Sequence, residues 1–434
     1  MSEWRNWGGN VRATPAQVQH AGSVEAVAAA VRRAAADGLR VRVAGSGHSF
    51  TPLVATDGLL LHVDRLSGVL GLDRERRRVR VFAGTPLHVL NPALQALGLA
   101  LPNLGDIDRQ TISGAIATGT HGTGTRRQGI AAAVSALSLV LADGSTLECS
   151  AEVEPEVFGA ARVGLGALGV VTTVELQCVP AYRLHAKEAG ASLTELLPVI
   201  QQEADAHDHL DLHWFPHTDR LLTKRNDVVG EGEGPPPLAA WRSRLDDDLL
   251  ANRVFEVANR LGAARPALVP AINRLSSRVL GSREFADDSW RVFCSSREVR
   301  FVESEYAVPR HDVEAVLTEL RAWFARTGAP VPFPVEVRFV GGDDVWLSTA
   351  YERDNAYVAV HQYHRMDPRP LFAAFESIVA EHEGRPHWGK VHTLGAQRLR
   401  ELYPRFDDFR AVRERLDPGH LFTNDHVARL LDDD

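Results

Sequence analysis

Two glycine-rich segments, each beside a predicted strand, constrain this chain of 434 residues most strongly. The first is GSGHSF at 45–50, directly after the alternating pattern of 39–43, and the second is SGAIATGTHGTG at 113–124. Glycine lets the backbone approach a ligand closely and turn its N–H groups toward an anion. Singly, each segment is also typical of a tight turn or a linker. Together, they predict an extended cofactor that carries a pyrophosphate.

The first segment does not fit a dinucleotide fingerprint. Its third glycine is absent, Pro52 follows, and residues 49–58 show no helical period. Neither GxSxG nor GxxxxGK[ST] occurs, so the usual markers of serine-hydrolase and P-loop chemistry are missing. A bare phosphate loop does not need an imidazole, so His48 is either incidental or serves the cofactor.

The composition is that of an ordinary globular chain, with 44% hydrophobic and 24% charged residues. At about 100–200 residues per domain, its length indicates two or three domains. A net charge of −8 provides no overall positive surface, so we expect neither nucleic acid nor an anionic membrane as a partner. The sequence carries no signal for an oligomeric state.

Three widely separated cysteines, Cys149, Cys178 and Cys294, do not form a disulfide framework, which favours a reducing compartment. The N-terminal MSEWRNWGGN lacks the basic and apolar regions of a secretory signal. No stretch of about 18 uncharged apolar residues is present. We therefore expect a cytoplasmic protein without a membrane anchor.

The hydropathy pattern changes near residue 182. Before it, strand and helix patterns alternate: a helix capped by Ser23 and ending before Gly38, strands at 39–43, 59–63, 136–141 and 169–179, a hairpin of 69–72 and 79–82, and a short helix over 92–97 begun by Asn91. After it come helical patterns at 193–206 and 312–325, a loop at 230–237, and strands at 334–339, 345–347 and 357–363. These changes predict a domain boundary at 182/183 and a softer one near 385.

A third pattern places a carboxylate and a guanidinium on one strand face. Glu336 and Arg338 are two residues apart and face the same side, and HWGK at 387–390 follows downstream. Such a pair suits a polyhydroxy substrate or developing negative charge, although a surface ion pair is the commoner outcome. His361 shares a strand face with Tyr357 and is either packed or catalytic.

Metal binding is not expected from the spacing of the histidines. His213 and His217 are four apart and His387 and His392 five apart, without HExxH or paired cysteines.

Eight motifs, in order, resemble the aldonolactone oxidase family of vanillyl-alcohol-oxidase-type flavoproteins. They are NWGGN at 6–10, VRVAGSGHSF at 41–50, NLGDIDRQTISGAIATGTHGTG at 103–124, LADGSTLECS at 141–150, VFGAARVGLGALGVVTTVELQCVP at 157–180, VEVRFVGGDD at 335–344, RPHWGKVH at 385–392 and LDPGHLFTN at 416–424.

The resemblance implies an α+β fold of two domains. Residues 1–182, completed by about 385–434, would form an FAD-binding domain, and residues 183–384 an α+β substrate cap. It also implies that His48 is bonded covalently to FAD. The other implied cofactor residues are Ala44, Gly45, Ser46, Gly47 and Ser49 at the pyrophosphate, and Ser113, Gly114, Thr118, Gly119, His121, Gly122 and Gly124 along the rest of FAD, with Gly105 and Asp106 nearby.

The activity implied by the resemblance is oxidation of the C2 hydroxyl of a small aldono-1,4-lactone, similar to L-gulono-1,4-lactone, by FAD. Molecular oxygen would be the acceptor and hydrogen peroxide the product, because Gly105 occupies a position where a small residue admits oxygen. Glu336, Arg338 and Lys390 carry over as substrate residues, and His361 joins them by similarity to alditol oxidases. Lys390, or a group near it, is expected to accept the hydroxyl proton, with the pKa of Lys390 lowered by a nearby cation. Arg338 is expected to stabilise negative charge, and Glu336 to orient Arg338 and bind a hydroxyl.

Several alternatives remain open from the sequence. One is an alditol oxidase acting on a terminal hydroxyl of xylitol or sorbitol, although those enzymes have serine where this chain has Asp106. Others are a lactone dehydrogenase with another electron acceptor, a reductase with non-covalent FAD and an NAD(P)H donor, and a flavin-binding protein without turnover.

Overall fold

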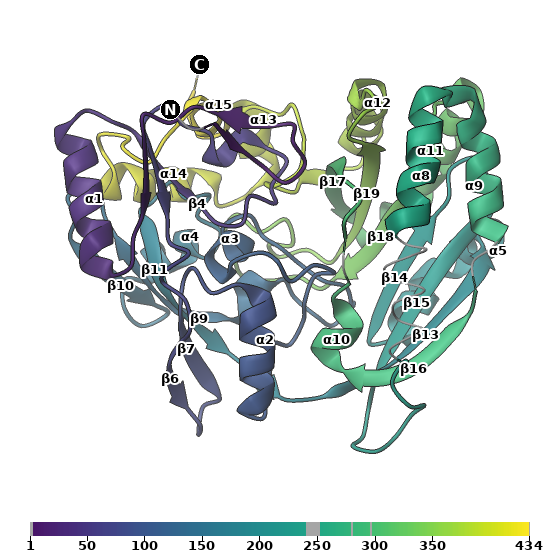
Figure 1. Cartoon of the computed structure of the whole chain (residues 1–434), viewed down its shortest axis with the longest axis horizontal. Coiled ribbons are helices and arrows are strands. Elements are labelled where there is room, and N and C mark those ends of the chain that lie inside the picture. The colour runs from purple at the N-terminus through teal and green to yellow at the C-terminus, as the bar shows by residue number, and fades with distance from the viewer. Residues whose placement is uncertain (1–2, 240–251, 279–280, 296, 434) are drawn as a thin grey trace.

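The computed structural model describes residues 3–239, 252–278, 281–295 and 297–433. These residues form two bodies side by side, one built from the N-terminal and C-terminal segments and the other from the segment between them (Figure 1). Each body has sheets with helices packed on them, so the architecture is α+β.

A small parallel sheet and its helix begin the first body. Strands β3 (Gln17–His20), β5 (Leu59–His62) and β4 (Val41–Ala44) pair in that order. Helix α1 (Val24–Ala36) packs on them, and Ser23 Oγ accepts a hydrogen bond from Ala26 N–H, which confirms the predicted cap. The loop that carries His48 leaves the carboxyl end of β4.

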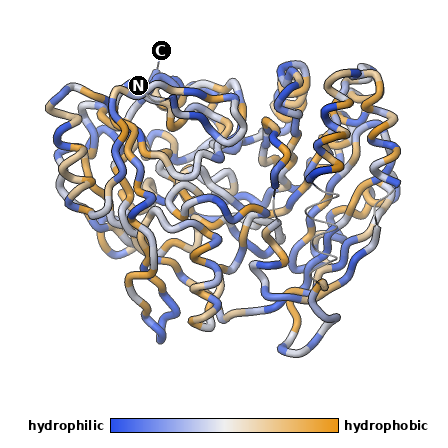
Figure 2. The backbone as a smooth tube through the Cα atoms, viewed as in Figure 1, coloured by the Kyte–Doolittle hydropathy of each residue, from blue (hydrophilic) through white to orange (hydrophobic). Residues whose placement is uncertain are grey.

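A five-stranded antiparallel sheet forms the centre of the first body. Its order is β10 (Thr146–Ser150), β9 (Val134–Val140), β11 (Val170–Gln177), β7 (Arg78–Phe82) and β6 (Val69–Asp73). The predicted β6–β7 hairpin is confirmed, and its tip is hydrophilic (Figure 2). The remaining short strands are β1 (Trp4–Arg5), which pairs with β2 (Arg12–Ala13), and β8 (Leu99–Ala100), which pairs with β12 (Val179–Pro180).

Helices from both ends of the chain share the core of this body. Leu399, Phe409 and Leu430 of the C-terminal segment pack in one cluster with Val79 and Leu137 of the sheet. The helices are α2 (Leu87–Ala96), α3 (Ile112–Ala117), α4 (Pro155–Ala161), α13 (Ala396–Leu402), α14 (Phe406–Leu416) and α15 (Asp425–Leu431). The C-terminal segment therefore packs on the N-terminal one.

An eight-stranded antiparallel sheet forms the second body. Its order is β16 (Arg283–Asp288), β13 (Arg183–Ser192), β15 (Arg220–Val229), β14 (His209–Trp214), β18 (Val335–Val340), β19 (Asn355–Tyr363), β17 (Phe301–Pro309) and β20 (Arg385–Pro386). The helices of this body are α5 (Leu193–Leu196), α6 (Ile200–Ala206), α8 (Phe255–Ala264), α9 (Val269–Arg278), α10 (Ser289–Phe293), α11 (Val313–Thr327) and α12 (Arg369–Ala380). Short 3₁₀ turns occur in both bodies: η1 (Pro52–Val54) and η2 (Ile130–Ala133) in the first, and η3 (Leu197–Val199), η5 (Pro266–Leu268) and η6 (Arg310–Asp312) in the second.

Alternation along β18 separates the two faces of this sheet. Val335, Val337 and Phe339 pack in one core with helices α11 and α12. Side chains at alternate positions point to the opposite face. Glu336 and Arg338 are therefore directed away from the helices.

Three local predictions are wrong in detail. Residues 345–347 form a turn rather than a strand, because the Asp343 carboxylate accepts hydrogen bonds from Val345 N–H and Ser348 Oγ–H. Helix α2 begins at Leu87 rather than after Asn91, with Pro86 preceding it. The pattern at 193–206 divides into α5, η3 and α6 around Pro198, which cannot donate a helical hydrogen bond.

Within the described part of the chain, no helix has the length and apolar character needed to cross a bilayer.

Candidate active site

A large pocket opens in the first body beside the two glycine-rich segments. It is lined by residues from 45–49, from 110–118, which include α3, and from 164–171, and encloses about 1050 Å³ including the part open to solvent. Two glycines shape its wall. A Cβ on Gly45 would lie 2.6 Å from Thr111 Oγ1, and the backbone of Gly47 has a φ of +69°. Glycine is required at both positions for these physical reasons.

His48 projects from this loop with one ring nitrogen unused. Its imidazole stacks with the indole of Trp7 at a centroid separation of 5.9 Å. Nδ1 is buried and has no hydrogen-bond partner among the described residues. Burial lowers the pKa of His48, so the ring is neutral and has a lone pair at neutral pH.

Only some of the predicted cofactor residues line the pocket. Those that do are Gly45, Ser46, Gly47, His48, Ser49, Ser113, Gly114 and Thr118. Ala44 is buried in β4, and the lining formed by described residues does not include Gly105, Asp106, Gly119, His121, Gly122 or Gly124. Gly124 instead joins the two bodies, because its N–H donates to Phe339 O at 2.6 Å.

A cluster of charged side chains lies between the two bodies with Arg338 at its centre. The Arg338 guanidinium contacts Glu336, and lies 3.5 Å from Asp211 Oδ2 and 3.6 Å from Asp106 Oδ1. Glu336 and Arg338 are each only 8% exposed, so the alternative of a surface ion pair is wrong. Asp106 comes from the first body and also pairs with Arg297 at 2.6 Å.

Charge and burial compete at the carboxylates of this cluster. Burial alone would raise the pKa of Asp106 and Asp211, but Arg297 and Arg338 outweigh it for Asp106, and Arg338 does so for Asp211, so both values fall well below the usual range. Burial raises the pKa of Glu336 against the opposing effect of Arg338, and the charge of Asp211 raises it further. Glu336 is therefore the carboxyl of the cluster that most readily holds a proton.

Lys390 lies beside this cluster and is paired with Glu303 of β17. Its ammonium contacts the Glu303 carboxylate, whose other oxygen lies 3.5 Å from His361 Nε2. Burial alone would lower the pKa of Lys390, but Glu303 and Glu305 outweigh it and raise the pKa. The prediction that a nearby cation lowers the pKa of Lys390 is therefore wrong. Lys390 is a fixed cation and cannot accept a proton.

Lys390 also adjoins the loop that carries His48. Phe50 N–H donates to Gly389 O at 2.7 Å, and the Lys390 ammonium lies 5.4 Å from the centroid of the Phe50 ring. Phe50 itself packs in the core of the second body. The charged cluster and the pocket therefore meet at residues 48–50.

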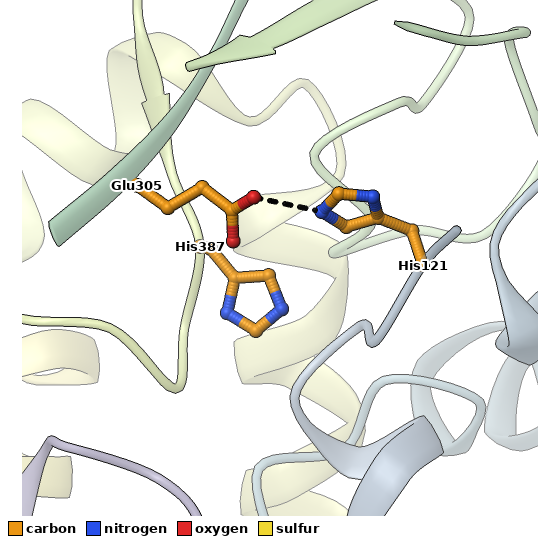
Figure 3. Close-up of side chains that lie close together, drawn as sticks. All are labelled: His121, Glu305 and His387. Carbon is orange, nitrogen blue, oxygen red and sulfur yellow. Dashed lines mark ion pairs between the residues drawn. The ribbon is translucent and has the colours of Figure 1, made fainter. Parts of the chain in front are cut away.

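His121, Glu305 and His387 form a second buried group at the junction (Figure 3). His121 Nε2 lies 3.3 Å from Glu305 Oε1, and His121 Nδ1 is 2.9 Å from Gly122 O. Gly389 N–H donates to His387 Nδ1 at 3.0 Å, and burial lowers the pKa of His387 to about 4. The remaining nitrogen of neutral His387 then carries a proton and cannot ligate a metal. This group is suited to hydrogen bonding rather than to metal coordination.

The structure adds several site residues that the sequence analysis missed: Asp211, Arg297, Glu303 and Glu305. A signal for some of them existed, because Glu303 and Glu305 alternate along β17 as Glu336 and Arg338 do along β18. Of the histidine pairs with metal-like spacing, His213 lies at the cluster, whereas His217 is elsewhere with Nε2 2.7 Å from Ala329 O.

Comparison with known proteins identifies the family of the chain. Residues 174–430 match the family model described as D-arabinono-1,4-lactone oxidase. The L-gulono-1,4-lactone dehydrogenase of Mycobacterium tuberculosis is 41% identical, with 99% of each chain covered. This chain belongs to the aldonolactone oxidase family. The resemblance seen in its motifs is thereby confirmed, and the chain is an oxidoreductase.

Further relatives of this aldonolactone oxidase family member carry related names. The L-gulonolactone oxidase of Bos taurus is 34% identical, covering 99% of this chain and 98% of the relative. The alditol oxidase of Streptomyces sp. (strain IKD472 / FERM P-14339) is 32% identical, covering 98% of both chains. The fold matches a crystal structure of cholesterol oxidase from B. sterolicum with a TM-score of 0.84 at 18% identity, covering 99% of this chain and 96% of that one. The predicted two-domain α+β fold of vanillyl-alcohol-oxidase type is confirmed.

The pocket fits the cofactor that the family uses. Residues 15–150 match a model described as an FAD binding domain, and this segment supplies most of the pocket wall. The unpartnered Nδ1 of His48 and the glycines at 45 and 47 leave room and a free ring nitrogen at one end of the pocket. The residues present therefore fit FAD.

Proposed function

We propose that the chain oxidises the C2 hydroxyl of an aldono-1,4-lactone similar to L-gulono-1,4-lactone, with O₂ as acceptor and H₂O₂ as product. The observation that carries the proposal is the buried cluster of Arg338, Glu336 and Lys390, which meets the His48 loop through Phe50 and Gly389. Two fixed cations and a carboxyl with a raised pKa, next to the pocket formed by the two glycine-rich segments, suit removal of a proton and a hydride from an alcohol.

The roles of the protein groups follow from their charges. Bound FAD supplies the hydride acceptor. Arg338 and Lys390 are held as cations by surrounding carboxylates and stabilise the negative charge that develops on the substrate oxygen. Glu336 accepts the hydroxyl proton at Oε2, the oxygen that faces His361 at 3.9 Å, because a carboxyl with a raised pKa is better matched to this transfer. His361 lies between Glu303 and Glu336 and orients the substrate hydroxyl.

The residues that would hold FAD are the pocket-lining segments 45–49 and 111–118. We include in the proposal a covalent bond from His48 to the flavin, supported by the buried, neutral ring with its unpartnered Nδ1. The variant His48→Ala is expected to lose all flavin on acid precipitation, whereas the wild-type pellet stays yellow. The absorbance of the redissolved pellet measures this.

Ser49→Ala is the matched control for His48→Ala, since Ser49 lines the same pocket and would form no covalent bond. Its pellet is expected to stay yellow. A yellow pellet from His48→Ala, or a colourless one from the wild-type chain, would refute the covalent bond.

The second candidate function is oxidation of an open-chain alditol, favoured by the alditol oxidase relative. Asp106 argues against it, because this carboxylate pairs with Arg338 and Arg297 at a position where alditol oxidases have serine. A panel of L-gulono-1,4-lactone, D-arabinono-1,4-lactone, xylitol and sorbitol, assayed for peroxide, separates the two functions. Higher kcat/KM on a polyol than on either lactone would overturn the lactone proposal.

The choice of O₂ as acceptor depends on Gly105. A Cβ at this position would lie 3.2 Å from His121 O, so alanine can be accommodated with a small shift. Gly105→Ala is expected to slow the reaction of the reduced enzyme with O₂ by about tenfold or more, with the anaerobic rate of reduction by lactone nearly unchanged. Stopped-flow measurement of the two half-reactions tests this prediction. If Gly105→Ala reacts with O₂ as fast as the wild-type chain, Gly105 does not control oxygen access.

A further inference from the structure

Two polar side chains of β14 extend the charged cluster beyond the residues so far given a role. Asp211 lies directly opposite Arg338, and His213 directly opposite Glu336, on neighbouring strands of the sheet. Paired positions of adjacent strands share one face, so all four side chains point toward the first body. Asp211 and His213 are 8% and 7% exposed.

Both side chains have a buried atom without a hydrogen-bond partner. Asp211 Oδ1 and His213 Nε2 face each other at 3.5 Å, and among the described residues neither atom has a hydrogen-bond partner beyond this contact. Nearly all buried polar atoms in proteins are hydrogen-bonded, to the protein, to ordered water or to a ligand. The Asp211 carboxylate and the His213 imidazole, side by side and without a further partner, can therefore bind polar groups of a ligand.

The spacing of Asp211, His213 and Glu336 would also allow a metal ion, but the surrounding charge argues against one. The Arg338 guanidinium lies 3.5 Å from Asp211 and contacts Glu336. A dication placed there would be repelled by this buried cation, and the repulsion is strong where water is excluded. A neutral ligand with hydroxyl groups suits the site better: one hydroxyl donates to Asp211 Oδ1 and a neighbouring one bonds to His213 Nε2.

The order of the strands decides which part of a substrate would reach these residues. β14 lies on one side of β18, whereas β19, which carries His361, and β17, which carries the Lys390 partner Glu303, lie on the other. Lys390 adjoins the His48 loop. A substrate whose reacting carbon lies at Glu336 and Lys390 would therefore extend its distal end toward Asp211 and His213.

We propose that Asp211 and His213 bind the exocyclic diol of a six-carbon aldono-1,4-lactone and so select it over a five-carbon lactone. This inference rests on the lactone oxidation proposed above. A hexono-1,4-lactone carries two neighbouring hydroxyls outside its ring, matching the two unpartnered atoms, whereas a pentono-1,4-lactone carries one.

The test compares L-gulono-1,4-lactone with D-arabinono-1,4-lactone in steady-state kinetics of the FAD-loaded chain. Asp211→Asn replaces the anionic acceptor by the weaker acceptor of a neutral amide, and His213→Phe removes the imidazole nitrogens; both keep the approximate size and shape of the side chain. His213→Phe is expected to lower kcat/KM for the hexonolactone by about tenfold or more, mainly through KM, and to change it by less than about threefold for the pentonolactone. Asp211→Asn also removes a charge beside Arg338, so it is expected to lower kcat/KM for both lactones, and for the hexonolactone by about tenfold more than for the pentonolactone. Asp208→Asn is the control, because Asp208 directly precedes β14 and its carboxylate lies 3.5 Å from Arg127 instead.

The outcomes separate this inference from the proposed function. Equal losses on both lactones would show that Asp211 and His213 act only by supporting Arg338 and Glu336, and would overturn the inference alone. No change on either lactone would overturn it as well. If the wild-type chain oxidises neither lactone, the proposed function fails and this inference fails with it.

Discussion

Replacing Lys390 by methionine is expected to slow anaerobic reduction of the bound flavin by lactone by about 10²–10³-fold, while the FAD content stays unchanged. Lys390 is held in place by Glu303, and its raised pKa keeps it cationic. Methionine fills a similar space but removes a preorganised positive charge from the place where charge develops on the substrate. Stopped-flow absorbance gives the rate, and the ratio of flavin to protein absorbance gives the FAD content.

The Lys390→Met variant leaves Glu303 buried without its cation, which by itself destabilises the fold. The double variant Lys390→Met/Glu303→Gln removes both charges and controls for this effect. We expect it to recover thermal stability but not the rate of reduction. A reduction rate within about twofold of wild type in Lys390→Met, or full recovery in the double variant, would show that the Lys390 charge has no part in the chemistry.

Replacing Arg338 by methionine is expected to lower the free energy of unfolding by about 3–5 kcal/mol at neutral pH and to abolish turnover. The guanidinium faces Glu336 and Asp211, which are buried, and Asp106, which is half-buried. Removing the cation leaves Glu336 and Asp211 uncompensated in a low-dielectric site, whereas Asp106 keeps its ion pair with Arg297. Urea unfolding of Arg338→Met beside wild type measures the loss, and Arg326→Met on the exposed surface of α11 is the control with little expected effect.

The pH dependence of this loss has a definite sign. In the wild-type chain the pKa values of Asp106 and Asp211 are lowered, so their ion pairs contribute stability above a pH of about 4 and lose it as the pH falls further. Without Arg338, burial raises the pKa values of Asp211 and Glu336, whereas Asp106 keeps its ion pair with Arg297, so Asp211 and Glu336 take up protons on acidification. The deficit of Arg338→Met relative to wild type should therefore shrink between pH 7 and pH 5. A deficit that is absent at pH 7, or that grows on acidification, would contradict this account.

The sequence predicted those features of the first body that depend on residues close together in the chain. Ser23, the β6–β7 hairpin and the glycines at 45 and 47 act through local conformation, which the sequence encodes directly. The strand predicted at residues 345–347 was wrong because a side chain, and not the hydropathy pattern, determines the conformation there. Their apolar pattern is typical of a strand, but hydrogen bonds to the Asp343 side chain fix a turn that no periodicity reveals.

Only those features of the candidate site that lie along a single strand could be predicted from the sequence. Alternation indicated that Glu336 and Arg338 share a face, but not that the face is buried. Burial depends on Asp106, more than 200 positions away in the chain, and on Asp211 of a neighbouring strand. The pKa of Lys390 was predicted with the wrong sign because its partner, Glu303, is likewise brought to it by the sheet.

The proposed oxidation of an aldono-1,4-lactone by bound FAD can be measured as reduction of the flavin under anaerobic conditions. The purified chain is mixed with L-gulono-1,4-lactone or with xylitol in the absence of O₂, and the flavin absorbance is followed in time. The lactone is expected to bleach the flavin rapidly and with saturation, and xylitol to do so far more slowly. Flavin that stays yellow with the lactone, or that xylitol bleaches faster, would contradict the proposed lactone oxidation.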